Sequence, residues 1–299
     1  MTSAKPPEHP VIGILWMLAT GFLFVAMTAG VKYVGPDVPP AQSAFLRFAL
    51  GLVFLLPMLP ALLRMRLSRS AIWLTGVRGA VHTVGVILWF YAMTQIPLAE
   101  VTAMNYLNPI YVTLGAALFL GERLAARRLL AVAAALFGAI LILRPGFREI
   151  SPGHIAMLGT AAGLAASYLI AKRLSGEMGA AMVVALLSLS VTVLLAPLAW
   201  WVWVPVTAHQ MVVLFLVAGA ATAAHYTMTR AFAAAPVTVT QPVTFLQLLW
   251  ATLLGAFVFH EPIDGWVILG GGIIMAAVLF ITWREAVLRR RIVPATVET

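Results

Sequence analysis

The sequence is poor in charge and contains no cysteine. Only 10% of its 299 residues are charged and 62% are hydrophobic, whereas soluble domains are about 25% charged and about 45–50% apolar. This composition excludes an ordinary soluble domain and indicates an integral membrane protein. The absence of cysteine excludes disulfides and cysteine-ligated metals. We expect no metal and no cofactor.

Catalytic and pore motifs are also missing. The sequence contains no His-Glu-x-x-His or Gly-x-Ser-x-Gly motif and no paired aspartates within an apolar run, which argues against membrane-embedded hydrolases. It has no ring-forming carbonyl signature and no run of pore-lining charge, which argues against a channel. We predict that the chain is not an enzyme. A membrane-embedded enzyme and an accessory protein without transport activity are the alternatives from other classes.

What the sequence does contain is a succession of apolar runs. A membrane-spanning helix requires roughly 20 mainly apolar residues, and none of the runs alternates apolar and polar residues as the strands of a membrane barrel do. The predicted fold is therefore all-α. The first run is long and lacks a small-residue cleavage site, which predicts a retained first helix. The ten predicted spans are 10–31, 42–63, 71–94, 98–119, 125–143, 153–172, 180–203, 210–234, 237–259 and 264–283.

Basic residues are concentrated in alternate loops. The net charge of +9 comes from 19 Lys and Arg against 10 Asp and Glu, and the positive-inside rule assigns the more basic loops to the cytoplasm. We therefore predict cytoplasmic termini in a bacterial cytoplasmic (inner) membrane, with anionic lipid rather than nucleic acid near the basic tail. The predicted cytoplasmic clusters are Arg64, Arg66 and Arg69; Arg123, Arg127 and Arg128; Lys172 and Arg173; and Arg284 with Arg289, Arg290 and Arg291.

Two segments of the chain carry the same pattern. Pro97 opens an apolar run that closes at Glu122, and Pro236 opens one that closes at Glu261, at a constant offset of 139 positions. Five predicted helices precede the turn at 144–146 and five follow it. An odd number of spans per repeat inverts the second copy in the membrane. We therefore predict two inverted five-helix repeats, 1–145 and 146–299.

Several short motifs occur in order along the chain: Phe45-Leu-Arg47-Phe, Arg78-Gly79, Trp89-Phe-Tyr91-Ala-Met93, Asn108-Pro109 and Arg230-Ala-Phe232. Over residues 10–284 this order resembles the EamA-type branch of the drug/metabolite transporter superfamily. The layout is most similar to a subgroup that includes bacterial uptake carriers for S-adenosylmethionine and riboflavin. The resemblance implies a central cavity lined by the first, third and fourth helices of each repeat.

The third apolar run carries polar residues on one face. Polar groups in the hydrocarbon core are costly and usually face the bundle interior. Arg78, His82 and Trp89 recur at intervals of four and seven, so they share a helix face. That face offers a cation, an imidazole and a stacking ring to an anionic or aromatic metabolite. In the alternative, Arg78 snorkels to the cytoplasmic surface and His82 bonds a carbonyl.

Amides and aromatic residues recur in the fourth and ninth runs. Asn105, Tyr106 and Asn108 directly precede Pro109, which removes a backbone donor and favours a bend. Bent helices at matching positions of two repeats are the expected place for the binding site of a carrier. Amide hydrogen bonds between helices are the structural alternative. The offset of 139 gives two pairs, Asn108 with Gln247 and Tyr111 with Trp250.

Other candidates lie at the depth of a cavity wall, with core packing or lipid contact as the alternative. They are Trp16 in the first run, Tyr168 in the sixth, and His225 and Tyr226 in the eighth. Arg47 is expected near the outer interface. Glu122 and Glu261 are expected at helix ends, where they fix loop geometry.

We predict a secondary transporter that moves a small polar or aromatic metabolite by alternating access. The resemblance suggests a vitamin such as riboflavin, an S-adenosylmethionine-like compound or an amino acid. An amino-acid or drug exporter of the same fold is the alternative. No carboxylate is predicted deep in a helix, because Glu100 lies near a helix start, so proton coupling would require His82 or His225. The expected partners are the small-molecule substrate and the lipid bilayer, with the chain as a monomer or homodimer.

Overall fold

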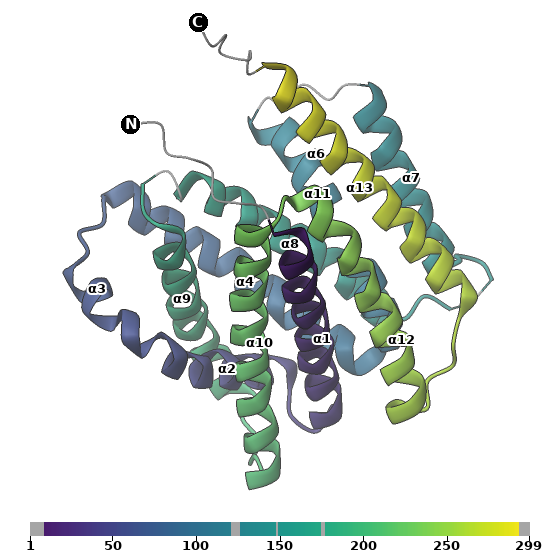
Figure 1. The fold of residues 1–299 in the computed structure, drawn as a ribbon. Helices are drawn as coiled ribbons and strands as arrows, with labels where there is room; N and C mark the ends of the chain where they lie inside the picture. Colours follow the sequence, from purple (N-terminus) through teal and green to yellow (C-terminus); the bar gives the residue numbers. More distant parts are fainter. Residues whose placement is uncertain (1–8, 121–125, 148, 175–176, 293–299) are drawn as a thin grey trace, which may run out of the picture.

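The computed structural model describes residues 9–120, 126–147, 149–174 and 177–292, and this part of the chain is helical without a strand (Figure 1). The predicted all-α fold is confirmed for these residues. The α-helices are α1 (Pro10–Val34), α2 (Pro40–Gly51), α3 (Leu59–Arg64), α4 (Arg69–Gln95), α5 (Leu98–Asn105), α6 (Asn108–Leu120), α7 (Ala126–Leu143), α8 (Pro152–Leu174), α9 (Ala180–Trp201), α10 (Ala208–Ala234), α11 (Val237–Thr240), α12 (Leu246–Phe259) and α13 (Gly265–Ile292). The 3₁₀ helices are η1 (Leu52–Met58) and η2 (Gln241–Phe245).

Nine helices among the described residues are long and apolar enough to cross a membrane. They agree with the predicted spans, and α2, η1 and α3 together supply one of them, Pro40–Leu62. The predicted span at 98–119 is not among the nine, because the chain there forms the two shorter helices α5 and α6. The prediction of ten spans therefore depends on whether this pair crosses the membrane as one broken helix.

Pro109 explains the break between α5 and α6. Proline has no N–H group, and its ring clashes with the carbonyl four residues earlier, which here belongs to Asn105. The amides of Tyr106 and Leu107 donate instead to carbonyls three residues back, at 3.2 and 3.0 Å. The helix resumes at Asn108. The break expected before the proline is present.

A second break lies between α11 and α12. Here the chain forms the 3₁₀ helix η2 around Pro242, and regular α-helix begins again at Leu246. The offset of 139 carries the turn at 106–107 onto 245–246, where η2 meets α12. The two breaks touch, since the Tyr106 hydroxyl donates to the Thr244 carbonyl at 3.0 Å.

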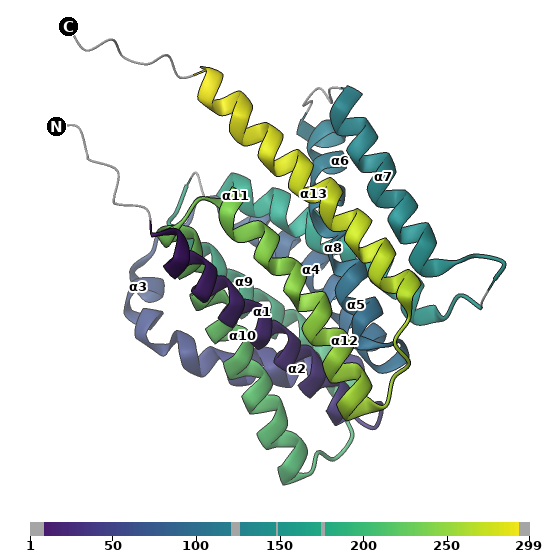
Figure 2. The same ribbon diagram turned by 45° about the vertical axis from the view of Figure 1, so that its right-hand side comes forward.

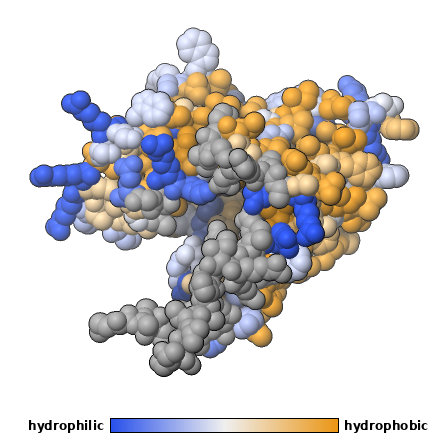
Figure 3. All heavy atoms as spheres, turned by 90° about the horizontal axis from the view of Figure 1, so that it is seen from above, coloured by the Kyte–Doolittle hydropathy of each residue, from blue (hydrophilic) through white to orange (hydrophobic). Residues whose placement is uncertain are grey.

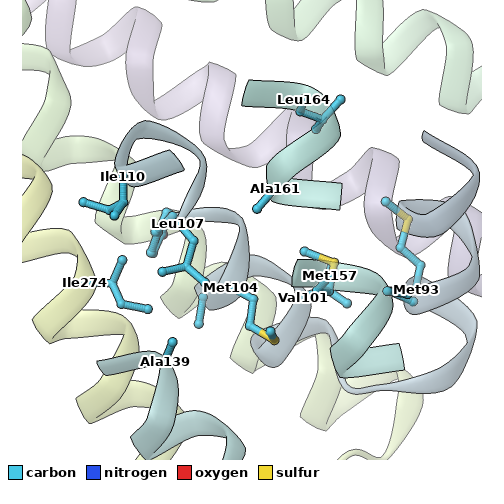
Figure 4. Close-up of a cluster of buried hydrophobic side chains, with 14 of the residues drawn as sticks. Met93, Val101, Met104, Leu107, Ile110, Ala139, Met157, Ala161, Leu164 and Ile274 are labelled. Carbon is cyan, nitrogen blue, oxygen red and sulfur yellow. The ribbon is translucent and has the colours of Figure 1, made fainter. Parts of the chain in front are cut away.

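Segments far apart in the sequence pack along one another. The most extensive pairings are α1 with α10, α4 with α8, and α7 with α13, and the last pair stands clear at the right of Figures 1 and 2. The hydrophobic core of the bundle contains a cluster of fully buried side chains that includes Met104, Leu107, Met157 and Ile274 (Figure 4). α1 begins and α13 ends on the same side of the molecule.

The helices α7 and α13 touch through their backbones at one pair of glycines. A Cβ atom on Gly138 would lie 2.6 Å from the Gly270 carbonyl oxygen, and one on Gly270 would lie 2.5 Å from the Gly138 carbonyl oxygen. Close backbone approach of this kind is typical of helix packing in membranes, where small residues give the best van der Waals fit.

We expect Gly138→Ala to destabilise the fold by about 1–3 kcal/mol, because the added methyl group pushes α13 away. Gly76→Ala is the matched control, since a Cβ atom there meets nothing within 4 Å and both variants gain the same helix propensity. Thermal unfolding in detergent measures the difference. Equal melting temperatures for the two variants would contradict the proposed contact.

Candidate substrate-binding site

A cavity of about 330 Å³ lies beside the two helix breaks. Its volume falls within the range of small-molecule sites, roughly 300–1,000 Å³. Residues from α1, α2, α4, α5, α6, α8, α10, η2, α12 and α13 form its wall. The predicted site residues that line it are His82, Trp89, Asn105, Tyr106, Asn108, Tyr168, His225 and Gln247.

The amides of the two repeated segments both reach this cavity. Asn108 donates through Nδ2 to Asn105 Oδ1 at 3.0 Å, and its own Oδ1 is buried without a hydrogen-bond partner in the described structure. Gln247 lies over Gly21 of α1, where a Cβ atom would come within 3.0 Å of its Cγ. The glycine leaves room for the glutamine. The site therefore offers an amide acceptor that the protein does not use.

Both histidines are oriented by neighbours. His225 Nδ1 lies 2.7 Å from the Ala221 carbonyl oxygen, and because a carbonyl only accepts, Nδ1 carries the proton and Nε2 is left for other contacts. His82 Nδ1 lies 3.1 Å from Ser167 Oγ. The His82 ring also meets the Phe48 ring edge-on, with centroids 6.2 Å apart. The imidazoles are thus held in place on two helices of the wall, α4 and α10.

Arg78 does not line the cavity. Its Nε donates to Ser167 Oγ at 3.3 Å and its Nη1 donates to the Val183 carbonyl at 2.8 Å, and the residue is buried. Neither predicted role holds, since the side chain neither faces the cavity nor snorkels to the surface. It instead joins α4 to α8 and α9. Ser167 is hydrogen-bonded to both Arg78 and His82, and the sequence did not reveal this link between α8 and α4.

Three further predicted residues also lie outside the cavity wall. Successive helix positions are rotated by about 100°, so Tyr226, next to His225, points elsewhere: it is 57% exposed and its hydroxyl accepts from Arg230 at 2.9 Å. The Arg230 guanidinium also lies over the Trp16 ring, 5.2 Å from its centroid. Trp250 is 37% exposed at the surface of the bundle. The sequence does not fix helix rotation, which is why these three residues do not lie on the wall of this cavity.

Arg47 is the cavity residue that sequence reasoning placed elsewhere. It lies midway along α2 and lines the cavity with Phe48, His82 and His225, rather than sitting at the outer interface. Its guanidinium carbon is 4.0 Å from the centroid of the Phe48 ring. The available signal was a cation within an apolar run, which usually faces a bundle interior.

An ionic network joins four helix ends on the face opposite the start of α1. Lys32, near the end of α1, pairs with Glu261 and donates to the Ile96 carbonyl at 2.8 Å. Glu261 Oε2 accepts from the Leu98 amide at 2.9 Å. Glu261 therefore does more than fix a loop, since it holds α1, α4, α5 and α12 together. Its counterpart in the repeat, Glu122, lies outside the described residues.

Two other pairs of charged or titratable side chains connect helices. Glu100 on α5 contacts His154 on α8, with both side chains 5% exposed, and Arg144 pairs with Asp264 at the ends of α7 and α13. Glu100 was predicted to lie near a helix start, and it does, but it is also buried against a partner that the sequence did not indicate. None of these four residues lines the cavity.

Comparison with known proteins agrees with this geometry. The model of the EamA-like transporter family matches residues 11–144 and again 151–283. A riboflavin transporter of Rhizobium johnstonii is 32% identical over 98% of this chain and 97% of its own length. A riboflavin transporter of Vibrio cholerae is 28% identical, covering 95% and 97%, and a Rickettsia prowazekii S-adenosylmethionine uptake transporter is 25% identical, covering 91% and 93%. The chain therefore belongs to the EamA-like transporter family.

Proposed function

We propose that the protein takes up a riboflavin-like heteroaromatic vitamin across the bacterial cytoplasmic membrane by alternating access. The observation that carries this proposal is a cavity with aromatic and amide walls that is lined by residues of both repeated segments. Its partners are then the vitamin and the surrounding lipid.

The cavity wall suits a flat ring with polar edges. Phe48, Trp89 and Tyr168 offer aromatic surface, while Asn108 and Gln247 offer amide groups. Small-molecule sites combine mainly apolar walls with a few polar groups that set orientation. The isoalloxazine ring of a flavin has both features, an aromatic body and carbonyl and N–H groups along one edge. The two relatives named riboflavin transporters support the same cargo.

The helix pairing supports two inverted repeats. α1 packs on α10 while α4 packs on α8, and α2 packs on α10 while α4 packs on α9, so these contacts between the halves form reciprocal pairs. The two separate matches to one family model support a division into residues 1–145 and 146–299. Counting α5 with α6 as one broken span gives ten helices, five per repeat. The basic loops then favour cytoplasmic termini.

The proposed state is open to the cytoplasm. Figure 3 looks onto the side where α1 begins and α13 ends, and hydrophilic residues gather around the middle of this face. Tyr168 lines the cavity yet is 47% exposed, which fits an opening near its end of the bundle. Lys32 and Glu261 lie at the opposite face. Alternating access then requires this network to separate when the outer face opens.

Uptake in proteoliposomes tests the function. We expect radiolabelled riboflavin to enter saturably and to exchange with riboflavin preloaded inside, because a carrier exposes one site to each side in turn. S-adenosylmethionine and amino acids serve as competing cargoes. Non-saturating flux would contradict a carrier, and saturable movement only of another cargo, or only outward, would favour the exporter alternative.

Variants of the amides test the site. We expect Asn108→Ala and Gln247→Ala each to weaken the apparent affinity for riboflavin about five- to tenfold, the effect of losing one hydrogen bond of about 1 kcal/mol. Trp250→Ala on the same helix as Gln247 is the control, since Trp250 does not line the cavity. Equal affinities in all three variants, at equal folded protein, would remove the amides from the site.

The ionic network is tested by labelling from outside. The natural chain has no cysteine, so Thr28→Cys, on the cavity wall one turn before Lys32, reports access without background. We expect Lys32→Met to speed its reaction with an impermeant thiol reagent in right-side-out vesicles, because the closed outer face loses its ion pair.

Arg144→Met is the matched control for this measurement. It breaks the Arg144–Asp264 pair, which joins α7 to α13 and does not touch α1 or α12. Its labelling rate should stay at the level of the chain that carries Thr28→Cys alone. An unchanged rate with Lys32→Met, or an equal increase with Arg144→Met, would refute a specific role for the Lys32–Glu261 contact.

A further inference from the structure

Among the described residues on the cavity wall, Arg47 alone is a permanent cation. Its guanidinium stacks on the Phe48 ring at 4.0 Å, but it makes no hydrogen bond and no ion pair with any residue that the structure describes. A charged side chain inside a membrane bundle is costly and is normally paired. Stacking on one ring offsets only part of that cost.

Other cations in the bundle do have partners. Lys32 pairs with Glu261, Arg144 pairs with Asp264, and Arg78 donates to a serine hydroxyl and a backbone carbonyl. Arg47 differs from them in facing an aqueous cavity. A cation that the protein leaves unpaired there is available to a ligand.

Two more polar atoms, on other residues of the cavity wall, are buried without a hydrogen-bond partner among the described residues. The Trp89 indole Nε1 is an unused donor and Asn108 Oδ1 is an unused acceptor, and both residues line the same cavity. A ligand that satisfies all three groups has acceptor oxygens for Arg47 and Trp89 and an N–H donor for Asn108. An imide-bearing heteroaromatic ring carries this combination.

The charge of the wall also restricts the ligand. No described carboxylate lines the cavity, so nothing there balances Arg47. We infer that Arg47 is the specificity-determining residue for charge: it binds an acceptor oxygen of a neutral or anionic heteroaromatic cargo and repels cations. This inference rests on the proposed function for its cargo, and it separates riboflavin-like cargoes from the cationic S-adenosylmethionine.

Charged thiol reagents measure this selectivity without any cargo. Met228→Cys supplies a thiol on the cavity wall, and Gly179→Cys supplies an exposed reference in the loop between α8 and α9. In purified protein we expect the ratio of two reaction rates, that of the anionic reagent sulfonatoethyl methanethiosulfonate over that of the cationic trimethylammonium reagent, to be about tenfold higher at position 228 than at position 179. A tenfold ratio corresponds to about 1.4 kcal/mol, half from attraction of the anionic reagent by Arg47 and half from repulsion of the cationic one.

Three variants decide the outcome. Arg47→Gln should bring the ratio at position 228 to that at position 179, Arg47→Lys should keep the preference for the anion, and the exposed control Arg64→Gln should leave it unchanged. A ratio that survives Arg47→Gln overturns the inference. If the thiol at position 228 reacts with neither reagent, the cavity is not accessible from solution, and this result also overturns the inference. A protein that moves no riboflavin but loses its charge preference with Arg47→Gln refutes the proposed cargo and leaves the role of Arg47 in place.

Discussion

Two interrupted helices govern this structure, because a membrane tolerates broken backbone hydrogen bonding only where protein or a cavity replaces the lipid. The breaks at 106–107 and 241–245 meet this condition by facing each other, with the Tyr106 hydroxyl on the Thr244 carbonyl. Pro109 and Pro242 favour these breaks, because each lacks an N–H group and its ring crowds the preceding turn. The cavity lies beside this contact, so the residues that interrupt the helices also determine where the wall carries amides.

The positions of the helices were predictable, since each needs only a long apolar run with turn residues at its ends. The offset of 139 likewise paired Asn108 with Gln247 beside matching proline-linked bends, and both residues line the same cavity. Rotation of the helices was not predictable. Helices that are apolar on all sides give no polarity contrast to show which face is inside, and so Tyr226 and Trp250 were assigned to a wall they do not reach.

Contacts between segments far apart in the chain could not be predicted from the sequence either. Arg78 is fixed by Ser167 and by the Val183 carbonyl, 89 and 105 positions away. The position of Arg47 was mispredicted for a related reason. The helix that contains it, α2, continues through η1 into α3 as one span, so the charge lies well inside the bundle. Contacts of this kind depend on which helices become neighbours, and apolar periodicity does not encode that choice.

The three ionic contacts differ in how readily they can separate. Glu100 and His154 are each 5% exposed, so parting them would strand charge or buried polar atoms in the bundle. Lys32 and Glu261 are 17% and 11% exposed at a helix end, where water can replace each partner as it leaves. Exposed ion pairs contribute about 0–1 kcal/mol, and breaking a buried one by removal of a partner costs about 3–5 kcal/mol. An ion pair whose contribution lies between these two free energies can keep one face closed. The binding energy of a cargo is still large enough to separate it, as a carrier that opens to both sides requires.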